Sequence, residues 1–405
     1  MIRKLLRFNW LSFGAMIALV VIGTLTIKSA GGARDVFFHD KWIDNLQTAV
    51  FGLAIYAVLA FVDYRRYLSW LSLPAYVGAV LLLVLVLLVG SSQMGGKRWL
   101  WFFQPSEVAK LCVLAFLSQV FGSEEFSFRG RFGFRGFLVA AGLAGLPALL
   151  ILMEPDLGTT LALVPAVIVI LLVAGVWRKG IVTMMGVGVL LAATLLGSVY
   201  EAEKPGAAEK TRQSIRYYLG AGDDRRTETQ EKRFALAPLK PHQYGRIQTF
   251  LFPEGDRTGG SYNYLQARIA IASGGVWGKG FGKGETNHLK YLPQSVSMND
   301  FIFCVYAEEQ GYMGSLALLG LFAVLCLSGV WTAGTATDLR GRLMALGVST
   351  LIFAHVYVNI AMSIGLVPIT GLPLPFISSG RTFLVIVMAG LGIVQSISIH
   401  REELR

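Results

Sequence analysis

The stretch SWLSLPAYVGAVLLLVLVLLVG at residues 69–90 contains no charged side chain. A helix rises about 1.5 Å per residue, so roughly 20 apolar residues cross the hydrocarbon core of a bilayer. The stretch therefore predicts a membrane-spanning helix. The whole chain is similarly apolar, because 54% of its 405 residues are hydrophobic and only 15% are charged. A soluble domain usually has about 25% charged residues, so the composition excludes an ordinary soluble protein.

Ten apolar stretches predict an all-α fold, a polytopic membrane protein with about ten transmembrane helices. We expect residues 1–405 to form a single membrane domain, interrupted by one large extracytoplasmic loop at 201–299. The first part of this loop, to about residue 240, is polar and predicts a flexible or surface-helical segment, whereas the second part is richer in glycine and aromatic residues. The predicted helices are 8–28, 45–63, 69–90, 105–122, 136–153, 158–176, 181–200, 300–330, 343–366 and 381–399.

The lysines and arginines of the short segments predict the orientation. Fourteen fall on the side of the N-terminus and five fall on the other side. Because cytoplasmic loops carry the excess of basic residues, we predict that both termini are cytoplasmic and that loop 201–299 is outside. The apolar run 10–27 could belong to a cleaved signal peptide. It is longer than the usual signal core of about 7–15 residues, which favours an uncleaved first helix.

Several kinds of site are disfavoured. The three cysteines form no CxxC pair and the five histidines have no metal-binding spacing, which argues against a disulfide framework or a zinc site. The net charge of +11 is a weak argument for a nucleic-acid partner, because much of it falls on the predicted cytoplasmic loops. We predict neither a metal site nor a nucleic-acid partner.

Asp300 is the candidate catalytic residue. It lies where loop 201–299 meets an apolar helix, and Glu308 follows about 12 Å along the helix axis. Ionisable groups in membrane helices are costly and usually face the bundle interior or a cavity. From residue type alone, a helix N-cap or an acid in the first helical turn is the favoured alternative for Asp300, although Ser297 or Asn299 could cap equally well.

Basic residues on the same predicted face could bind an anionic substrate. Lys110 lies one turn after Glu107. For these cations, an ion pair within the helix together with extension of basic side chains towards the membrane surface is a serious alternative. The glycine-rich segment 274–284 contains two of the lysines, and its backbone N–H groups could surround an anion, although its spacing is not that of a P-loop. The candidate cations are Arg98, Lys110, Arg246, Lys279 and Lys283.

Two turns complete the predicted site. Glu154 and Asp156 lie in a tight outer turn, where Asp156 is either a substrate-binding residue or the N-cap of the next helix. Segment 368–380 has three prolines in eight residues, which precludes a regular helix. Irregular backbone at membrane depth is tolerated only against protein or a wet cavity, so this segment is predicted to form a re-entrant or interfacial wall.

The motifs resemble those of the SEDS family, in that family's order and over nearly the whole chain. Within the family, the chain looks more like RodA, the elongation member, than FtsW, the division member. The motifs are GKRW at 96–99, QPSE at 104–107, PDLG at 155–158, SGG at 273–275, GKG at 278–280, DFIF at 300–303, AEE at 307–309 and PLPFIS at 373–378.

The resemblance implies a peptidoglycan glycosyltransferase of the bacterial inner membrane. It would polymerise lipid II during cell-wall elongation and the maintenance of cell shape, with a class B penicillin-binding protein as its transpeptidase partner. The essential acid of the family falls on Asp300. The chain departs from the family pattern before this helix, where residues 294–299 are two residues longer and lack a usual glutamate. It departs again at Glu154, where the family has glutamine, and at Arg381 after the proline-rich segment.

The expected chemistry is attack by an acceptor sugar hydroxyl on a lipid-pyrophosphate donor, with Asp300 as the base and the cations on the pyrophosphate. The sequence identifies no cofactor. A divalent cation, Mg²⁺ or Mn²⁺, is the alternative that could share the stabilisation of the pyrophosphate with the basic side chains. The substrate-binding set is Arg98, Glu107, Lys110, Asp156, Arg246, Lys279, Lys283 and Glu308. Two other functions stay open, a lipid II flippase and a non-catalytic scaffold for a transpeptidase.

Overall fold

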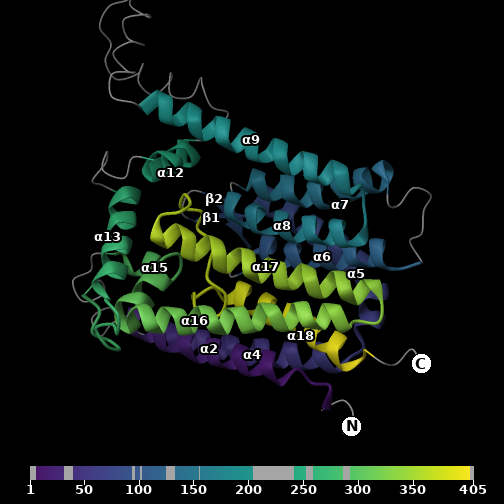
Figure 1. Ribbon diagram of the computed structural model, residues 1–405, viewed down its shortest axis with the longest axis horizontal. Coiled ribbons are helices and arrows are strands. Elements are labelled where there is room, and N and C mark those ends of the chain that lie inside the picture. The colour runs from purple at the N-terminus through teal and green to yellow at the C-terminus, as the bar shows by residue number, and fades with distance from the viewer. Residues whose placement is uncertain are drawn as a thin grey trace, which may run out of the picture.

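A computed structural model shows a bundle of long helices (Figure 1). It describes residues 6–31, 40–93, 96–100, 103–124, 133–154, 156–203, 241–251, 259–285 and 292–401. Each of the ten predicted helices matches a helix in the structure. They are α2 (Trp10–Gly31), α4 (Lys41–Phe61), α5 (Tyr64–Val89), α6 (Pro105–Gly122), α7 (Phe134–Met153), α8 (Leu157–Ala174), α9 (Arg178–Glu203), α16 (Ile302–Thr335), α17 (Leu339–Ile364) and α18 (Arg381–Ile399).

Among the described residues, seven helices are long and apolar enough to cross a bilayer, namely α2, α4, α5, α7, α16, α17 and α18. The apolar part of α8, Gly158–Ala174, is shorter. The predicted all-α class is therefore confirmed. The boundaries shift by up to five residues because polar caps extend some helices beyond their apolar runs. For example, Asp63 accepts a hydrogen bond from the backbone N–H of Arg65 at 3.0 Å and starts α5.

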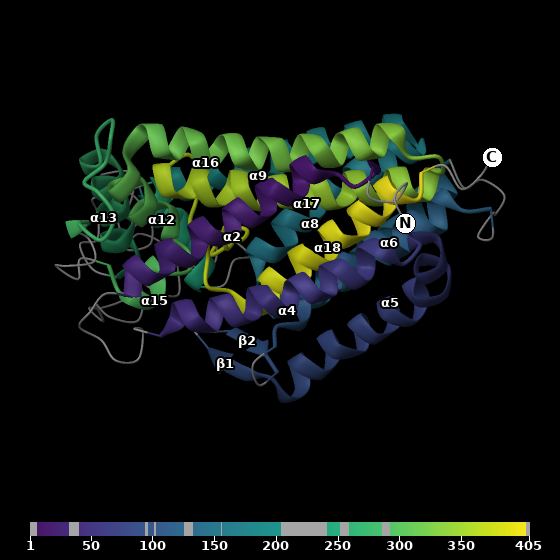
Figure 2. The same cartoon turned by 90° about the horizontal axis from the view of Figure 1, so that it is seen from below.

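The bundle has two distinct ends. Helix α2 begins and α18 ends at the same end, which we call the terminal end (Figures 1 and 2). The opposite end, the loop end, carries α12 (Pro241–Leu251), α13 (Gly259–Ser273), α15 (Gln294–Ser297) and an antiparallel hairpin of β1 (Ser91–Gln93) and β2 (Gly96–Trp99). These short elements were not predicted from the sequence. The polar segment expected up to residue 240 lies outside the described residues from 204 onward.

Helices α17 and α18 form most of the interior. α17 packs against α16, α8, α6 and α18, and α18 packs against α4. Small residues allow this close packing, because a Cβ on Gly392 of α18 would lie 2.8 Å from the carbonyl oxygen of Tyr56 in α4. A bundle packed in this way holds the loop end on a rigid base.

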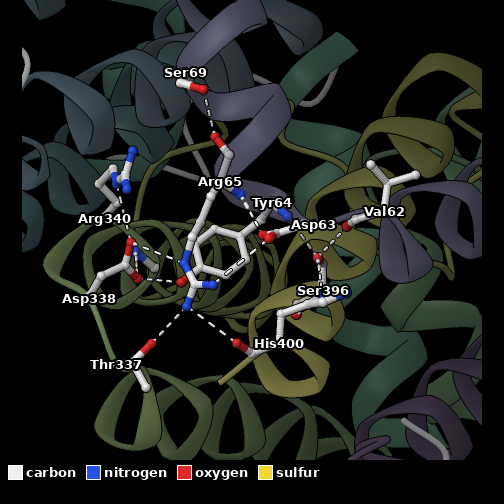
Figure 3. Close-up of polar contacts among 11 residues, drawn as sticks. Val62, Asp63, Tyr64, Arg65, Ser69, Thr337, Asp338, Arg340, Ser396 and His400 are labelled. Atoms are coloured by element: carbon white, nitrogen blue, oxygen red, sulfur yellow. Dashed lines mark hydrogen bonds and ion pairs between the residues drawn. The ribbon is translucent and has the colours of Figure 1, made fainter. Parts of the chain in front are cut away.

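A polar network fastens the terminal end (Figure 3). Asp338 caps α17 through the backbone N–H of Gly341 at 3.2 Å and accepts a hydrogen bond from the hydroxyl of Tyr64. The guanidinium of Arg65 donates to the hydroxyl of Thr337 at 2.9 Å and to the carbonyl of His400 at 3.3 Å. The network thus joins the α4–α5 turn, the α16–α17 turn and the end of α18.

Candidate active site

Asp300 lies at the loop end, in the turn that connects α15 to α16. It precedes Phe301, the N-cap of α16, which makes no capping hydrogen bond from its side chain, and the first turn of α16 contains no acidic residue. The capping alternative for Asp300 is therefore wrong. The residue as a whole is half-buried.

The proline-rich segment forms a wall beside this turn, as predicted. Its backbone is irregular between Gly365 and Gly380, and Leu372, Leu374 and Phe376 are buried. Ser378 donates from its hydroxyl to the carbonyl of Asn299 at 2.7 Å, and Ser379 donates to the Asn299 side chain at 2.6 Å. The Asp300 turn and the wall are therefore joined directly.

The side chains of Arg246 of α12 and of Asp300 both lie close to Gly371. A Cβ placed on Gly371 would lie 3.6 Å from Oδ2 of Asp300 and 3.8 Å from Nη2 of Arg246. The same guanidinium donates from Nη1 to the carbonyl of Thr370 at 3.0 Å. Gly371 has a φ of +76°, a conformation that glycine adopts without strain. It leaves a gap where an L side chain would lie close to both charged groups.

Arg98 of β2 and Asp156 form the other side of the site. Nη1 of Arg98 lies 3.9 Å from Oδ1 of Asp156, and its Nε donates to the carbonyl of Glu154 at 3.2 Å. Asp156 also caps α8 through the backbone N–H of Thr159 at 3.1 Å and accepts from Nε2 of Gln104 at 3.1 Å. The capping alternative for Asp156 is therefore confirmed, and this residue also holds Arg98 in place.

The charged groups of the site shift one another's pKa values. Burial raises the pKa of Asp300, Arg246 and Arg98 oppose the rise, and Asp156 adds to it. Burial and the charge of Arg98 lower the pKa of Arg246, against Asp300 and Asp156. The sequence thus brings together Asp300, Arg98, Arg246 and Asp156 from four separate segments, and their charges suit an anionic ligand beside a base.

Comparisons with known proteins agree with this architecture. A family model for FtsW, RodA and SpoVE, described as cell cycle protein, matches residues 5–218 and 231–403. The chain belongs to this family. It is 32% identical over 394 residues to peptidoglycan glycosyltransferase MrdB of Escherichia coli K12, a match that covers 96% of this chain and 93% of that protein. It is 28% identical to peptidoglycan glycosyltransferase RodA of Treponema pallidum, over 98% of this chain and 99% of that one.

Solved structures of the FtsW/RodA/SpoVE family have the same fold. A chain from a peptidoglycan synthase complex, described as coordinating polymerization and crosslinking, superposes with a TM-score of 0.73 at 26% identity, over 98% of this chain and 99% of that one. The rod shape determining protein RodA of Thermus thermophilus gives a TM-score of 0.64 at 25% identity, with 98% of each chain covered. The polytopic fold and the RodA-like character are therefore shown.

Glu107 and Lys110 of this family member lie inside the bundle. Their charged groups are 2.8 Å apart, and the side chains are only 3% and 1% exposed. The predicted ion pair within the helix is confirmed, whereas extension of Lys110 towards the membrane surface is wrong. Protein covers both side chains, so in this structure they lie inside the bundle and not on its surface.

Lys279 and Glu308 form a further cluster around the kink of α16. Nζ of Lys279 lies 2.8 Å from Oε1 of Glu308. The backbone N–H groups of Lys279 and Gly280 donate to the carbonyls of Glu308 and Glu309 at 3.0 and 2.9 Å. These N–H groups are thus not available to an anion as the sequence analysis expected. Their hydrogen bonds hold the glycine-rich segment against α16 near the kink at Gly311. Lys283, in the same segment, is exposed.

Two important residues escaped the sequence analysis, His355 and Asn359 of α17. Both are completely buried, and they contact the proline-rich wall through Pro373 and Leu372. Their signal was present in the sequence. Two polar side chains four residues apart on an apolar helix share a face, and such residues usually point into a membrane bundle.

Proposed function

We propose that this chain polymerises lipid II into glycan strands, as a RodA-type peptidoglycan glycosyltransferase that serves cell-wall elongation and cell shape. The relatives named above are peptidoglycan glycosyltransferases, and this chain matches them over almost their full length. The observation that carries the mechanism is that the carboxylate of Asp300 and the guanidinium of Arg246 both lie close to Gly371. A base beside a cation is the pair needed to activate a hydroxyl and to stabilise a leaving pyrophosphate.

In the proposed reaction, the acceptor sugar hydroxyl attacks the anomeric carbon of a lipid-linked donor sugar. A new C–O bond forms while the bond from that carbon to the pyrophosphate oxygen breaks. The hydroxyl proton passes to Asp300, and the electron pair leaves with the lipid pyrophosphate. Inversion at the anomeric carbon gives a β-1,4 linkage. The raised pKa of Asp300 makes its carboxylate a stronger base than an exposed aspartate.

Arg246 and Arg98 are the residues proposed to stabilise the pyrophosphate. Arg246 is fixed by Thr370, and Arg98 is fixed by Glu154 and Asp156. A guanidinium forms paired hydrogen bonds to phosphate oxygens, so pre-positioned arginines lower the cost of binding. Lys279 and Glu308 remain proposed contacts for the parts of the substrate further from the reacting atoms.

The donor set fits an anion better than a divalent cation. Among the described residues, no three His, Cys, Asp or Glu side chains converge on one point, and the carboxylates of Asp156 and Asp300 both face arginine. Magnesium or manganese prefers several oxygen ligands without a competing cation. No step of the proposed reaction is therefore assigned to a metal.

The proposed setting follows from the distribution of charge. We place the loop end outside the inner membrane and both termini in the cytoplasm, since the basic residues of the short loops favour this orientation. A class B penicillin-binding protein is the proposed partner. The related synthase complex, described as coordinating polymerization and crosslinking, supports such an assembly.

The test uses the full chain purified with its transpeptidase partner and supplied with lipid II. We expect Asp300→Asn to abolish glycan polymer while the complex stays intact. Asp40→Asn is the matched control, because Asp40 is exposed just before α4 and its side chain caps no helix. Normal polymer from Asp300→Asn would overturn the catalytic role. A separate vesicle assay scores translocation, and lipid II movement without polymer would support a flippase instead.

A further inference from the structure

The buried face of α17 that carries His355 and Asn359 contacts the turn that contains Asp300. The two residues are four apart and therefore lie one above the other on the helix. Nδ2 of Asn359 donates to the carbonyl of Asp300 at 3.0 Å and to the carbonyl of Leu372 at 2.7 Å. One side-chain amide thus uses both hydrogens to join the catalytic turn to the proline-rich wall.

His355 makes the adjoining contacts. Its Nε2 lies 2.8 Å from Nζ of Lys110, and its Nδ1 lies 3.3 Å from the carbonyl of Pro373. A lysine ammonium can only donate, so Nε2 accepts and the ring proton is on Nδ1, where it donates to Pro373. α17 therefore holds two consecutive carbonyls of the wall, one through each residue.

The wall requires donors of this kind. Pro373 and Pro375 have no backbone N–H, so this segment cannot pair with itself in a regular structure. A buried carbonyl without a hydrogen bond is costly. The side chains of α17 satisfy two of these carbonyls and in doing so fix the position of the segment.

The same contacts determine where the charged groups of the site lie. Leu372 follows Gly371, which lies close to both Asp300 and Arg246, and Arg246 itself donates to the carbonyl of Thr370. Movement of Leu372 relative to Asp300 would therefore change the distance between the carboxylate and the guanidinium. The amide of Asn359 opposes such movement by contacting both carbonyls directly, in addition to the contacts of Ser378 and Ser379 with Asn299.

We propose that Asn359 is a positioning residue of the glycosyltransferase, which acts by holding Asp300 and Leu372 at a fixed separation. This proposal rests on the proposed function and extends it to a residue that does not touch the substrate. It requires that loss of the two amide hydrogen bonds slows turnover more than it weakens the binding of lipid II. Misplacement by about 1 Å can cost on the order of 100-fold in rate.

The experiment compares Asn359→Leu, Asn359→Gln and the control Ser349→Ala in the complete complex with lipid II. Leucine has a similar size but donates no hydrogen bond. Glutamine keeps the amide on a side chain one methylene longer. Ser349 is also buried in α17 and donates one hydrogen bond to a backbone carbonyl, that of Ala345 at 2.7 Å, so its loss measures the effect of a missing hydrogen bond away from the site.

We expect kcat of Asn359→Leu to fall about 10- to 100-fold, with KM for lipid II within about twofold of wild type. The acid limb of its pH profile should move to higher pH, because a carboxylate further from Arg246 is less stabilised. Asn359→Gln should recover part of kcat, and Ser349→Ala should match wild type. A reduced fraction of folded enzyme would lower kcat without moving the acid limb.

The proposal is overturned if Asn359→Leu keeps its kcat, if its acid limb does not move, or if Ser349→Ala loses as much activity. Should Asn359→Leu fail to fold, Asn359→Ser decides by the same criteria, since serine keeps a single donor in a smaller side chain. The proposed function fails by a different result, namely normal polymer from Asp300→Asn with Asn359 intact.

Discussion

Nζ of Lys110 lies 2.8 Å from Nε2 of His355 and 2.8 Å from Oε2 of Glu107, and all three side chains are buried. The contact joins α6 to α17 inside the bundle. The ammonium therefore contacts both a carboxylate and a neutral imidazole. The other ring nitrogen of the imidazole donates a hydrogen bond to the carbonyl of Pro373 in the proline-rich wall. A change at Lys110 should therefore affect the loop end as well as the helix packing.

Removal of one partner from this buried ion pair should be more harmful than removal of both. We expect Lys110→Met to destabilise the protein by about 3–5 kcal/mol, because it leaves the carboxylate of Glu107 buried and unpaired. The double variant Glu107→Gln/Lys110→Met leaves no unpaired charge and should be more stable than Lys110→Met. Thermal unfolding in detergent measures both. Equal stabilities for the single and double variants would show that the pair does not act as a unit.

The pH dependence of polymerisation should depend on Arg246. Burial raises the pKa of Asp300 and Arg246 opposes the rise, so activity should fall as the pH drops through this raised pKa. Arg246→Gln removes the opposing charge, which should raise the pKa further and move the acid limb to higher pH. KM for lipid II should also increase if Arg246 binds the pyrophosphate. Rates measured between pH 5 and pH 9 test this, and a limb that moved to lower pH would contradict the assignment of Asp300 as the base.

The sequence was sufficient for the long helices because lipid requires long apolar stretches, and these are visible residue by residue. It also named Asp300 and Arg246 as candidates, Asp300 because the family's motif falls on it and Arg246 as one of several cations in the long loop. The pair of Glu107 and Lys110 within α6 was predictable from its spacing. Other pairs were not, because Lys279 meets Glu308 and Arg98 meets Asp156 only where separate elements come together. Asn359 acts through two backbone carbonyls, and no pattern of side chains reports such contacts.

Glu154 should make stability fall as the pH rises. Its side chain is buried, both carboxyl oxygens lack a hydrogen-bond partner among the described residues, and burial followed by the charge of Asp156 raises its pKa to about 8 despite Arg98. The native state then keeps a proton that the unfolded chain loses above about pH 4.3, so stability decreases from there to about pH 8.

Glu154→Gln removes this dependence. We expect the unfolding temperature of the variant to exceed that of wild type at pH 8 and the difference to be small at pH 5. Asp40→Asn serves as the control, because Asp40 is exposed and its loss should change neither value. A difference that is the same at both pH values would show that the carboxyl of Glu154 titrates alike in the folded and unfolded states.

Substitutions at two glycines of the glycine-rich segment distinguish the cost of an unfavourable backbone conformation from the cost of disturbed packing. Gly275 and Gly278 both have positive φ, +56° and +80°. A Cβ on Gly275 would meet nothing within 4 Å, whereas a Cβ on Gly278 would overlap the carbonyl oxygen of Glu309. Gly275→Ala should therefore cost only the conformational penalty of about 1–2 kcal/mol.

Gly278→Ala has the same penalty and must also separate the segment from α16, which should add roughly 1–3 kcal/mol. The overlap lies at the hydrogen bonds that Lys279 and Gly280 donate to Glu308 and Glu309, and these bonds hold the kinked start of the helix that follows Asp300. We therefore expect Gly278→Ala to lower polymerisation as well as the unfolding temperature, and Gly275→Ala to lower the unfolding temperature alone. Equal effects of the two substitutions on activity would mean that the glycine-rich segment does not hold the catalytic end of α16.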